Sequence, residues 1–162
     1  MITKFENYNG FDAYEDNTNW IKALNDEDYD TIKIMIENGF DVNKKLDFND
    51  EAKKETAIMV SAFDQNYDIT KLLIDNGADL YAKDYNWHNI LMKACFGYYD
   101  DENNVIKLIL DNTNNSILTA TNKKKKTFMY YLNKKGKDMF KNEYPEKYKY
   151  INKFKKAKEF NL

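Results

Sequence analysis

The side chains that most often carry chemistry are scarce in this sequence of 162 residues, which has one histidine, His88, and one cysteine, Cys95. Zinc sites draw mainly on several cysteine and histidine ligands, and a nucleophilic site needs a base placed beside its serine or cysteine. The sequence contains no HExxH pair, no glycine-rich phosphate loop and no calcium-loop spacing. It therefore predicts no catalytic, cofactor-binding or metal-binding residues, and we expect the protein not to be an enzyme.

The isolated reactive residues have simple structural interpretations. Cys95 occupies a small-residue position within an apolar segment, which predicts a buried and unreactive thiol. No motif places a serine or cysteine beside His88, and we expect this histidine to be exposed on a binding surface. The acidic run Asp100–Glu102 could chelate a hard cation, but an acidic cluster without further ligand spacing is a weak signal.

The composition limits where the protein works. All 25 basic residues are lysines, and the high content of asparagine, tyrosine and phenylalanine is typical of an AT-rich genome, such as that of a virus, a phage or a host-associated bacterium. No apolar run approaches the roughly 18 residues that a membrane span needs. A single cysteine fits a reducing compartment. We therefore expect a cytoplasmic protein, in the host cytoplasm if it is viral or an effector, with no membrane contact.

The elements that must position any binding residues are repeated along the chain. Three apolar runs, TIKIMI, ITKLLI and VIKLIL, each carry lysine in third place (Lys33, Lys71 and Lys107). Apolar residues at helical spacing around each lysine predict amphipathic helices. Gly39 and Gly77 follow the first two runs and predict helix C-caps, because glycine readily adopts the left-handed conformation. In the third run Asn112 or Thr113 replaces this glycine.

A shorter apolar helix is predicted before each of these runs, over Thr18–Asn25, Thr56–Phe63 and Asn89–Phe96. Thr18 and Thr56 both lie 21 residues before the capping glycine of their unit. We expect the Thr56 hydroxyl to accept a free backbone N–H at the start of its helix.

This pattern resembles the ankyrin repeat, a unit of about 33 residues with a β-turn and two antiparallel helices. KLLIDNGADL (Lys71–Leu80) is close to the second helix and turn of that family, and ETAIMVSA resembles its TPLHxAA segment with Ala57 and Met59 in the proline and histidine places. The resemblance covers about residues 13–117 and extends more weakly to 132, with extra residues expected around 46–55 and 98–104. It implies an all-α solenoid of about four helix-turn-helix units. The boundaries that we expect are an N-terminal arm or cap at 1–12, repeats at 13–44, 45–82 and 83–117, and a degenerate fourth repeat with a basic cap at 118–162.

The C-terminal part departs from the repeat pattern. TNKKKKTFMYYLN resembles the turn and first helix of a fourth unit, but no second helix is predicted at the usual spacing. Residues 142–160 instead predict one helix with Pro145 in its first turn and an apolar stripe of Tyr144, Tyr148, Ile151 and Phe154. Because a solenoid must end in a unit with a polar outer face, we interpret it as a lysine-coated capping helix. The alternative is a docking surface for an acidic partner or nucleic acid.

The resemblance implies a non-catalytic protein-binding module, acting as an adaptor or an inhibitor through the turns and first helices of its concave face. Trp87 falls where the family usually has a turn glycine. The partner-binding residues carried over onto this sequence are Phe63, Asp64, Tyr85, Asn86, Trp87, His88, Lys93, Phe96, Lys124 and Lys126.

The charge is divided along the chain and leaves two alternatives open. Residues 1–117 hold 23 acidic side chains and 11 lysines, whereas residues 118–162 hold 4 and 14, so the two parts have net charges of −12 and +10. This division favours electrostatically steered binding of a protein partner. It also allows a nucleic-acid-binding function for the basic region, although arginine is absent, and a weak, salt-sensitive self-association of an otherwise monomeric chain.

Overall fold

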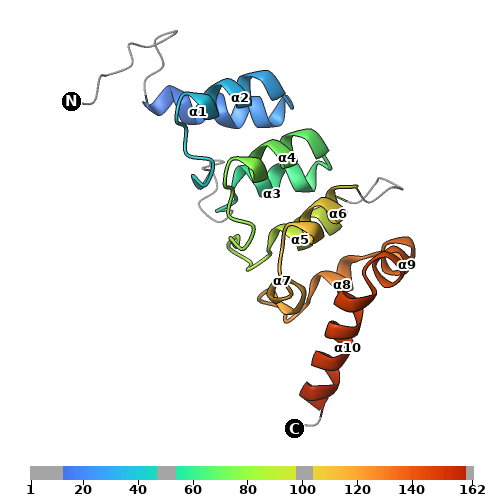
Figure 1. The fold of residues 1–162 in the computed structure, drawn as a ribbon. Helices are drawn as coiled ribbons and strands as arrows, with labels where there is room; N and C mark the ends of the chain where they lie inside the picture. Colours follow the sequence, from blue (N-terminus) through green and yellow to red (C-terminus); the bar gives the residue numbers. More distant parts are fainter. Residues whose placement is uncertain (1–12, 47–53, 98–103, 160–162) are drawn as a thin grey trace, which may run out of the picture.

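The fold is a row of stacked helix pairs. A computed structural model describes residues 13–46, 54–97 and 104–159, and within these residues it contains ten helices and no strand. The first three pairs follow one another in chain order in Figure 1, and each contacts the next. This arrangement confirms the predicted all-α solenoid. The pairs are α1 (Ala13–Asn25) with α2 (Tyr29–Glu37), α3 (Ala57–Phe63) with α4 (Tyr67–Asp75), and α5 (Ile90–Phe96) with α6 (Asn104–Asp111).

The turn inside each of the first two pairs is built by the same local chemistry. Asp28 and Asn66 are the N-caps of α2 and α4, and their side-chain oxygens accept the backbone N–H groups of residues 31 and 69 at 3.0 Å. Glu27 and Gln65, one residue earlier, have φ angles of 55° and 60°. This left-handed residue followed by a cap reverses the chain within a few residues, so the two helices pack antiparallel.

The ends of the second helices agree with the sequence. Gly39 and Gly77 have φ angles of 87° and 82°, as the predicted C-caps require. The third unit ends without glycine: the Thr113 hydroxyl donates to the carbonyl oxygen of Ile109 at 2.7 Å, and the Asn112 amide donates to that of Leu108 at 2.8 Å. Side-chain donors thus satisfy the free carbonyls of α6.

Two expectations about the first helices were wrong. Helix α1 begins at Ala13, so Thr18 lies inside this helix and not at its start. Thr56 is the N-cap residue of α3, but its buried hydroxyl has no hydrogen-bond partner among the described residues. Asn89 does form the cap of α5, accepting the backbone N–H of Met92 at 2.9 Å.

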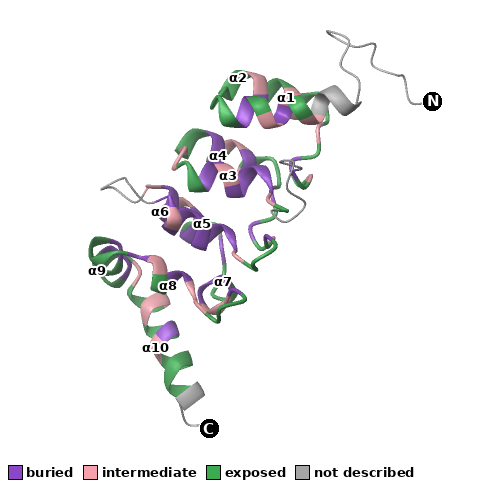
Figure 2. Ribbon diagram, turned by 180° about the vertical axis from the view of Figure 1, so that it is seen from behind, coloured by how far each residue is buried: buried purple, intermediate pink, exposed green. Residues whose placement is uncertain are grey.

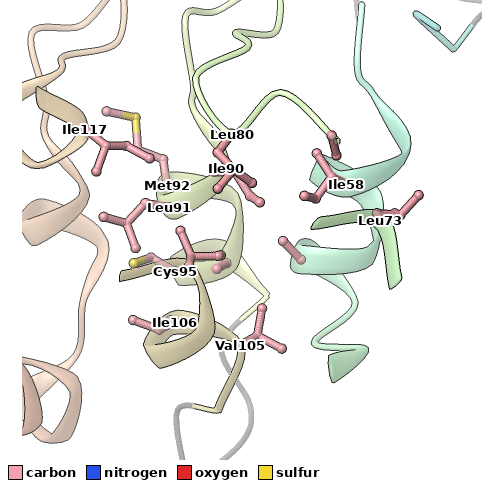
Figure 3. Close-up of a cluster of buried hydrophobic side chains, with 14 of the residues drawn as sticks. Ile58, Leu73, Leu80, Ile90, Leu91, Met92, Cys95, Val105, Ile106 and Ile117 are labelled. Atoms are coloured by element: carbon pink, nitrogen blue, oxygen red, sulfur yellow. The ribbon is translucent and has the colours of Figure 1, made fainter. Parts of the chain in front are cut away.

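The core runs as a layer between successive pairs. Figure 3 shows side chains of α3, α4, α5 and α6 pointing into the space between neighbouring helices, among them Ile58, Leu73, Ile90 and Ile106, all at most 1% exposed. Figure 2 shows the exposed residues concentrated on the outer surfaces of the pairs. Since no single pair encloses its apolar side, each depends on its neighbour for burial.

The fourth unit is more complete than the sequence indicated. After the short helices α7 (Ser116–Thr119) and α8 (Phe128–Tyr131), helix α9 (Lys134–Glu143) forms the second helix that was predicted to be missing. Phe140 of α9 packs edge-on against Phe128 of α8, with ring centroids 5.3 Å apart. Only three residues of α9 are buried, so its apolar periodicity is too sparse to be recognised in the sequence.

Helix α10 (Pro145–Glu159) follows as the terminal element of the solenoid (Figure 1). It begins at Pro145, later than predicted. Ile151 is buried and Tyr148 half-buried, whereas Phe154 at the end of the stripe is 36% exposed. The hydroxyl of Tyr144 donates to Asp111 at 2.9 Å, and Lys147 donates to the carbonyl oxygen of Thr113 at 2.9 Å. These bonds fix the cap to the end of α6.

Several sequence-based predictions fall outside the described residues: the arm at 1–12, most of the extra residues at 46–55 and 98–104, and the acidic run at 100–102. None of the helices in the described residues is long and apolar enough to cross a bilayer.

The contact between the second and third units predicts an intolerant position at Gly97. A Cβ atom there would lie 1.4 Å from the backbone carbonyl oxygen of Phe63, so Gly97→Ala forces α3 and α5 apart. We expect a loss of at least about 3 kcal/mol in the free energy of unfolding, measured by urea denaturation. Gly39→Ala is the control, because it meets only backbone strain in open space and should cost about 1 kcal/mol. Equal losses for the two variants would contradict this packing.

Candidate protein-binding surface

The third and fourth units each have a turn before their first helix, α5 or α8. We call the turn at residues 83–88 finger 3 and the turn at residues 121–127 finger 4. In finger 3, Asp84 Oδ1 accepts the backbone N–H groups of Asn86 and His88, both at 2.8 Å. In finger 4, the Asn122 side-chain oxygen accepts those of residues 124 and 126, both at 3.0 Å. Asp84 and Asn122 hold equivalent places 38 residues apart, so both fingers are shaped by one short side chain.

The tips of the fingers have the left-handed backbone that favours glycine. Trp87 has a φ angle of 64°, and Lys125, its equivalent in finger 4, has 57°. This geometry agrees with the expectation that Trp87 stands in a glycine place. Large side chains are therefore held at the tips despite backbone strain, and the Trp87 side chain is 54% exposed.

Fingers 3 and 4 form one continuous surface. The backbone N–H of Lys123 donates to the carbonyl oxygen of Asn86 at 3.0 Å. The ammonium of the same lysine lies 3.5 Å from the centroid of the Tyr85 ring, within the range of a cation–π contact. Lys126 lies over Tyr130 in the same way, at 4.3 Å. The two fingers are thus joined through both backbone and side chains.

Beneath the fingers lies a buried polar cluster centred on Lys93. Its ammonium is ion-paired with Glu55 and lies 3.1 Å from Asp84 Oδ2, and the three side chains are only 5–19% exposed. His88 Nδ1 lies 2.9 Å from the same Asp84 oxygen. Burial alone would raise the pKa of Asp84, but the hydrogen bonds from His88 and Lys93 outweigh it and hold this pKa below its usual value.

This cluster corrects the expectation that His88 lies exposed on the surface. Only 16% of its side chain is exposed, and its ring packs edge-on against Phe96 and Tyr131, at 4.9 and 6.3 Å between centroids. Phe96 and Tyr131 also contact each other at 4.4 Å. The Tyr131 hydroxyl accepts the Asn122 amide at 2.6 Å, which links this aromatic group to finger 4.

The ten sequence-predicted residues therefore separate by location. Phe63 (47% exposed) and Asp64 lie at the C-terminal end of α3, away from the fingers, where burial and the charges of Glu27 and Glu55 raise the pKa of Asp64. Lys93, His88 and Phe96 are engaged with other side chains of this chain. Those brought together on the joined fingers are Tyr85, Asn86, Trp87, Lys124 and Lys126.

Sequence reasoning missed two members of this region. Tyr130, 61% exposed, is the most exposed aromatic side chain of the described residues, and it follows the lysine run of finger 4. Asp84 organises finger 3 and pairs with Lys93. Its position five residues before the N-cap of α5, Asn89, is matched by Asn122 five residues before the N-cap of α8, Thr127, and this repeat is the signal that identifies it.

Cys95 and the possible metal ligands are the candidate reactive groups among the described residues. Cys95 is 4% exposed, which confirms the predicted burial, and this burial raises the pKa of its thiol. In the described part of the chain no three histidine, cysteine or carboxylate side chains gather so as to hold a metal ion.

Stacked helix pairs with projecting, joined turns define a helical repeat protein of the solenoid class. The family model for ankyrin repeats (three copies) matches residues 20–122, and the chain belongs to this family. A comparison with curated proteins gave no match. Ankyrin repeats generally mediate protein–protein interaction and are typically non-catalytic.

The Lys93 cluster predicts a large difference between two lysines. Lys93→Met keeps most of the aliphatic stem but leaves the Asp84 and Glu55 carboxylates facing each other without a cation. We expect it to lower the free energy of unfolding by about 3 kcal/mol. Lys71→Met, which removes the exposed i,i+4 pair with Asp75, is the control and should leave stability nearly unchanged. The free energies of unfolding are measured by urea denaturation. Equal losses for the two variants would contradict a structural role of Lys93.

The lowered pKa of Asp84 predicts how stability responds to acid. Asp84→Asn keeps an oxygen for the finger backbone, as Asn122 does, but removes the charge that faces Lys93 and His88. A carboxylate with a lowered folded pKa stabilises the fold above its unfolded pKa and loses this contribution as the pH falls through the folded value. The gap in unfolding free energy between wild type and Asp84→Asn should therefore shrink below about pH 4. Asp75→Asn is the exposed control. A gap that persists undiminished in acid would contradict the proposed pairing.

Proposed function

We propose that the protein is a non-catalytic protein-binding module that acts as an adaptor or an inhibitor by occupying a partner's surface. The observation that carries the proposal is the surface formed by the joined fingers and the adjoining helix α8, which together carry Tyr85, Trp87 and Tyr130, the three most exposed aromatic side chains of the described residues. Exposed aromatic anchors are enriched among the residues that dominate binding energies at protein interfaces.

The fixed geometry of the fingers supports a binding role. Asp84 and Asn122 hold the two turns from within, and the bond from Lys123 to Asn86 holds them to each other. A surface that is already ordered loses less conformational entropy when a partner arrives, so less of the binding energy is spent on ordering. The acidic repeats and basic C-terminal region would add electrostatic steering to the encounter.

The alternative is binding of nucleic acid through the basic C-terminal region. The run Lys123–Lys126 beside exposed aromatic rings is the observation that favours it, because lysines and stacking platforms together bind single strands. Against it are the net charge of −12 over residues 1–117 and the absence of arginine, which supplies most bidentate phosphate contacts.

Site-specific photo-cross-linking tests the proposed function. A benzophenone amino acid at position 130 places the reactive group on the finger surface, and the same group at Ile34, 57% exposed on α2, gives a control of similar exposure. In extract of the cells that naturally make the protein, we expect a protease-sensitive, nuclease-resistant adduct from position 130 alone. Adducts that nuclease removes would favour the alternative, and equal adducts from both positions would refute a specific finger surface.

A further inference from the structure

We propose that the segment recognised by the fingers is an acidic peptide segment with apolar or aromatic side chains among its carboxylates. The inference deepens the proposed function and rests on it. The site, which we call the lysine–aromatic surface, consists of Lys83 and Lys123–Lys126 together with Tyr85, Trp87 and Tyr130.

The charge of this surface is uncompensated within the described chain. Five lysines come from the two fingers, and the one acidic residue of these fingers, Asp84, is buried and already paired with Lys93 and His88. No ion pair joins any of the five lysines to another described residue. A partner that brings carboxylates therefore meets positive charge that no described residue neutralises through an ion pair.

The aromatic rings place that charge at defined positions. Lys123 lies on the face of Tyr85 and Lys126 on that of Tyr130, while Lys83 lies 6.0 Å from the Trp87 ring. These three ammonium groups are thus held near a ring before any ligand binds, which restricts the rotamers of their side chains. The surface alternates ammonium groups with half-exposed rings, so it suits a ligand that alternates carboxylates with apolar side chains.

The face of the first helices below the fingers has fewer side chains that a ligand could contact. Its Lys93 ammonium is enclosed by Glu55 and Asp84, and Phe96 packs against His88 and Tyr131. Engaging these side chains from outside would mean breaking buried ion pairs, which costs several kcal/mol. The recognition groups are therefore concentrated on the fingers of repeats 3 and 4 rather than across the concave face.

An acidic peptide fits better than a nucleic acid. A bound strand long enough to leave the fingers would meet residues 1–117, whose net charge of −12 repels phosphates. The lysine ammonium is a compact point charge, whereas the planar guanidinium of arginine can form two parallel hydrogen bonds to a phosphate. A short acidic segment can reach the five lysines of the two fingers without extending over the rest of residues 1–117, where the acidic side chains outnumber the lysines.

Selection of displayed random peptides on the full chain tests the proposal. We expect the selected peptides to be enriched in aspartate and glutamate and to contain apolar residues, and their affinities to fall as salt rises. The double change Lys124→Glu and Lys125→Glu should weaken the selected peptides at least about tenfold. The matched control is Lys153→Glu with Lys156→Glu on α10, an equal charge change at two exposed lysines, which should leave affinity almost unaltered.

A second variant separates binding from folding. Trp87→Gly removes the exposed indole and suits the left-handed backbone at that position, so the protein should be at least as stable as wild type. The same peptides should still bind this variant at least about tenfold more weakly.

Three binding results would overturn the inference: selected peptides without acidic enrichment, acidic peptides whose affinity the finger substitutions do not change, or a thymidine oligonucleotide that binds the fingers more tightly than the peptides. The last assigns the surface to nucleic acid. Salt-sensitive dimers in sedimentation that the finger substitutions abolish would assign it instead to the acidic repeats of a second copy. If the peptide test fails while cross-linking at position 130 still captures a protein, the proposed function stands without this ligand class; if both fail, the proposed function falls as well.

Discussion

The structure depends on one constraint: no helix pair can bury its apolar side except against the next pair. Trp20, Ile58, Ile90 and Phe128, one from the first helix of each unit, are all at most 1% exposed. At Gly97 the backbone packs directly against the backbone of Phe63 and leaves no room for a side chain. Because burial is shared in this way, the end of the stack must be covered, and the last helix of the fourth unit, α9, and the terminal helix α10 do this with few apolar residues and many lysines.

The same stacking determines which side chains remain available for recognition. Bringing the first helices together encloses Lys93 between Glu55 and Asp84, and it packs Phe96 against His88 and Tyr131. These contacts fix the spacing between the second, third and fourth units, but they also remove polar and aromatic groups from the concave face. The fingers extend beyond the packed layer, and their aromatic and lysine side chains remain exposed there.

The strained backbone of the fingers supports the proposal that they form a binding surface. Trp87 and Lys125 adopt a left-handed backbone that glycine would tolerate at lower cost, and short side chains at Asp84 and Asn122 hold both turns in place. Glycine at positions 87 and 125 would make the fold more stable, because glycine adopts this backbone without strain. The large side chains found there add exposed aromatic surface and positive charge to a rigid support.

The sequence by itself determined the helix pairs, because apolar residues at helical spacing and the glycines at 39 and 77 are local signals of helices and of their ends. It also determined the family, the buried Cys95 and the glycine-like position of Trp87. Only the tertiary structure decided that His88 and Lys93 are enclosed, that α9 exists and that Tyr130 joins the fingers. Each of these depends on contacts between residues far apart in the chain, such as the 38 residues that separate Glu55 from Lys93. A local pattern cannot show which charged side chains will pair with each other, and for that reason the proposed binding surface could be assigned to the fingers only from the stacked units.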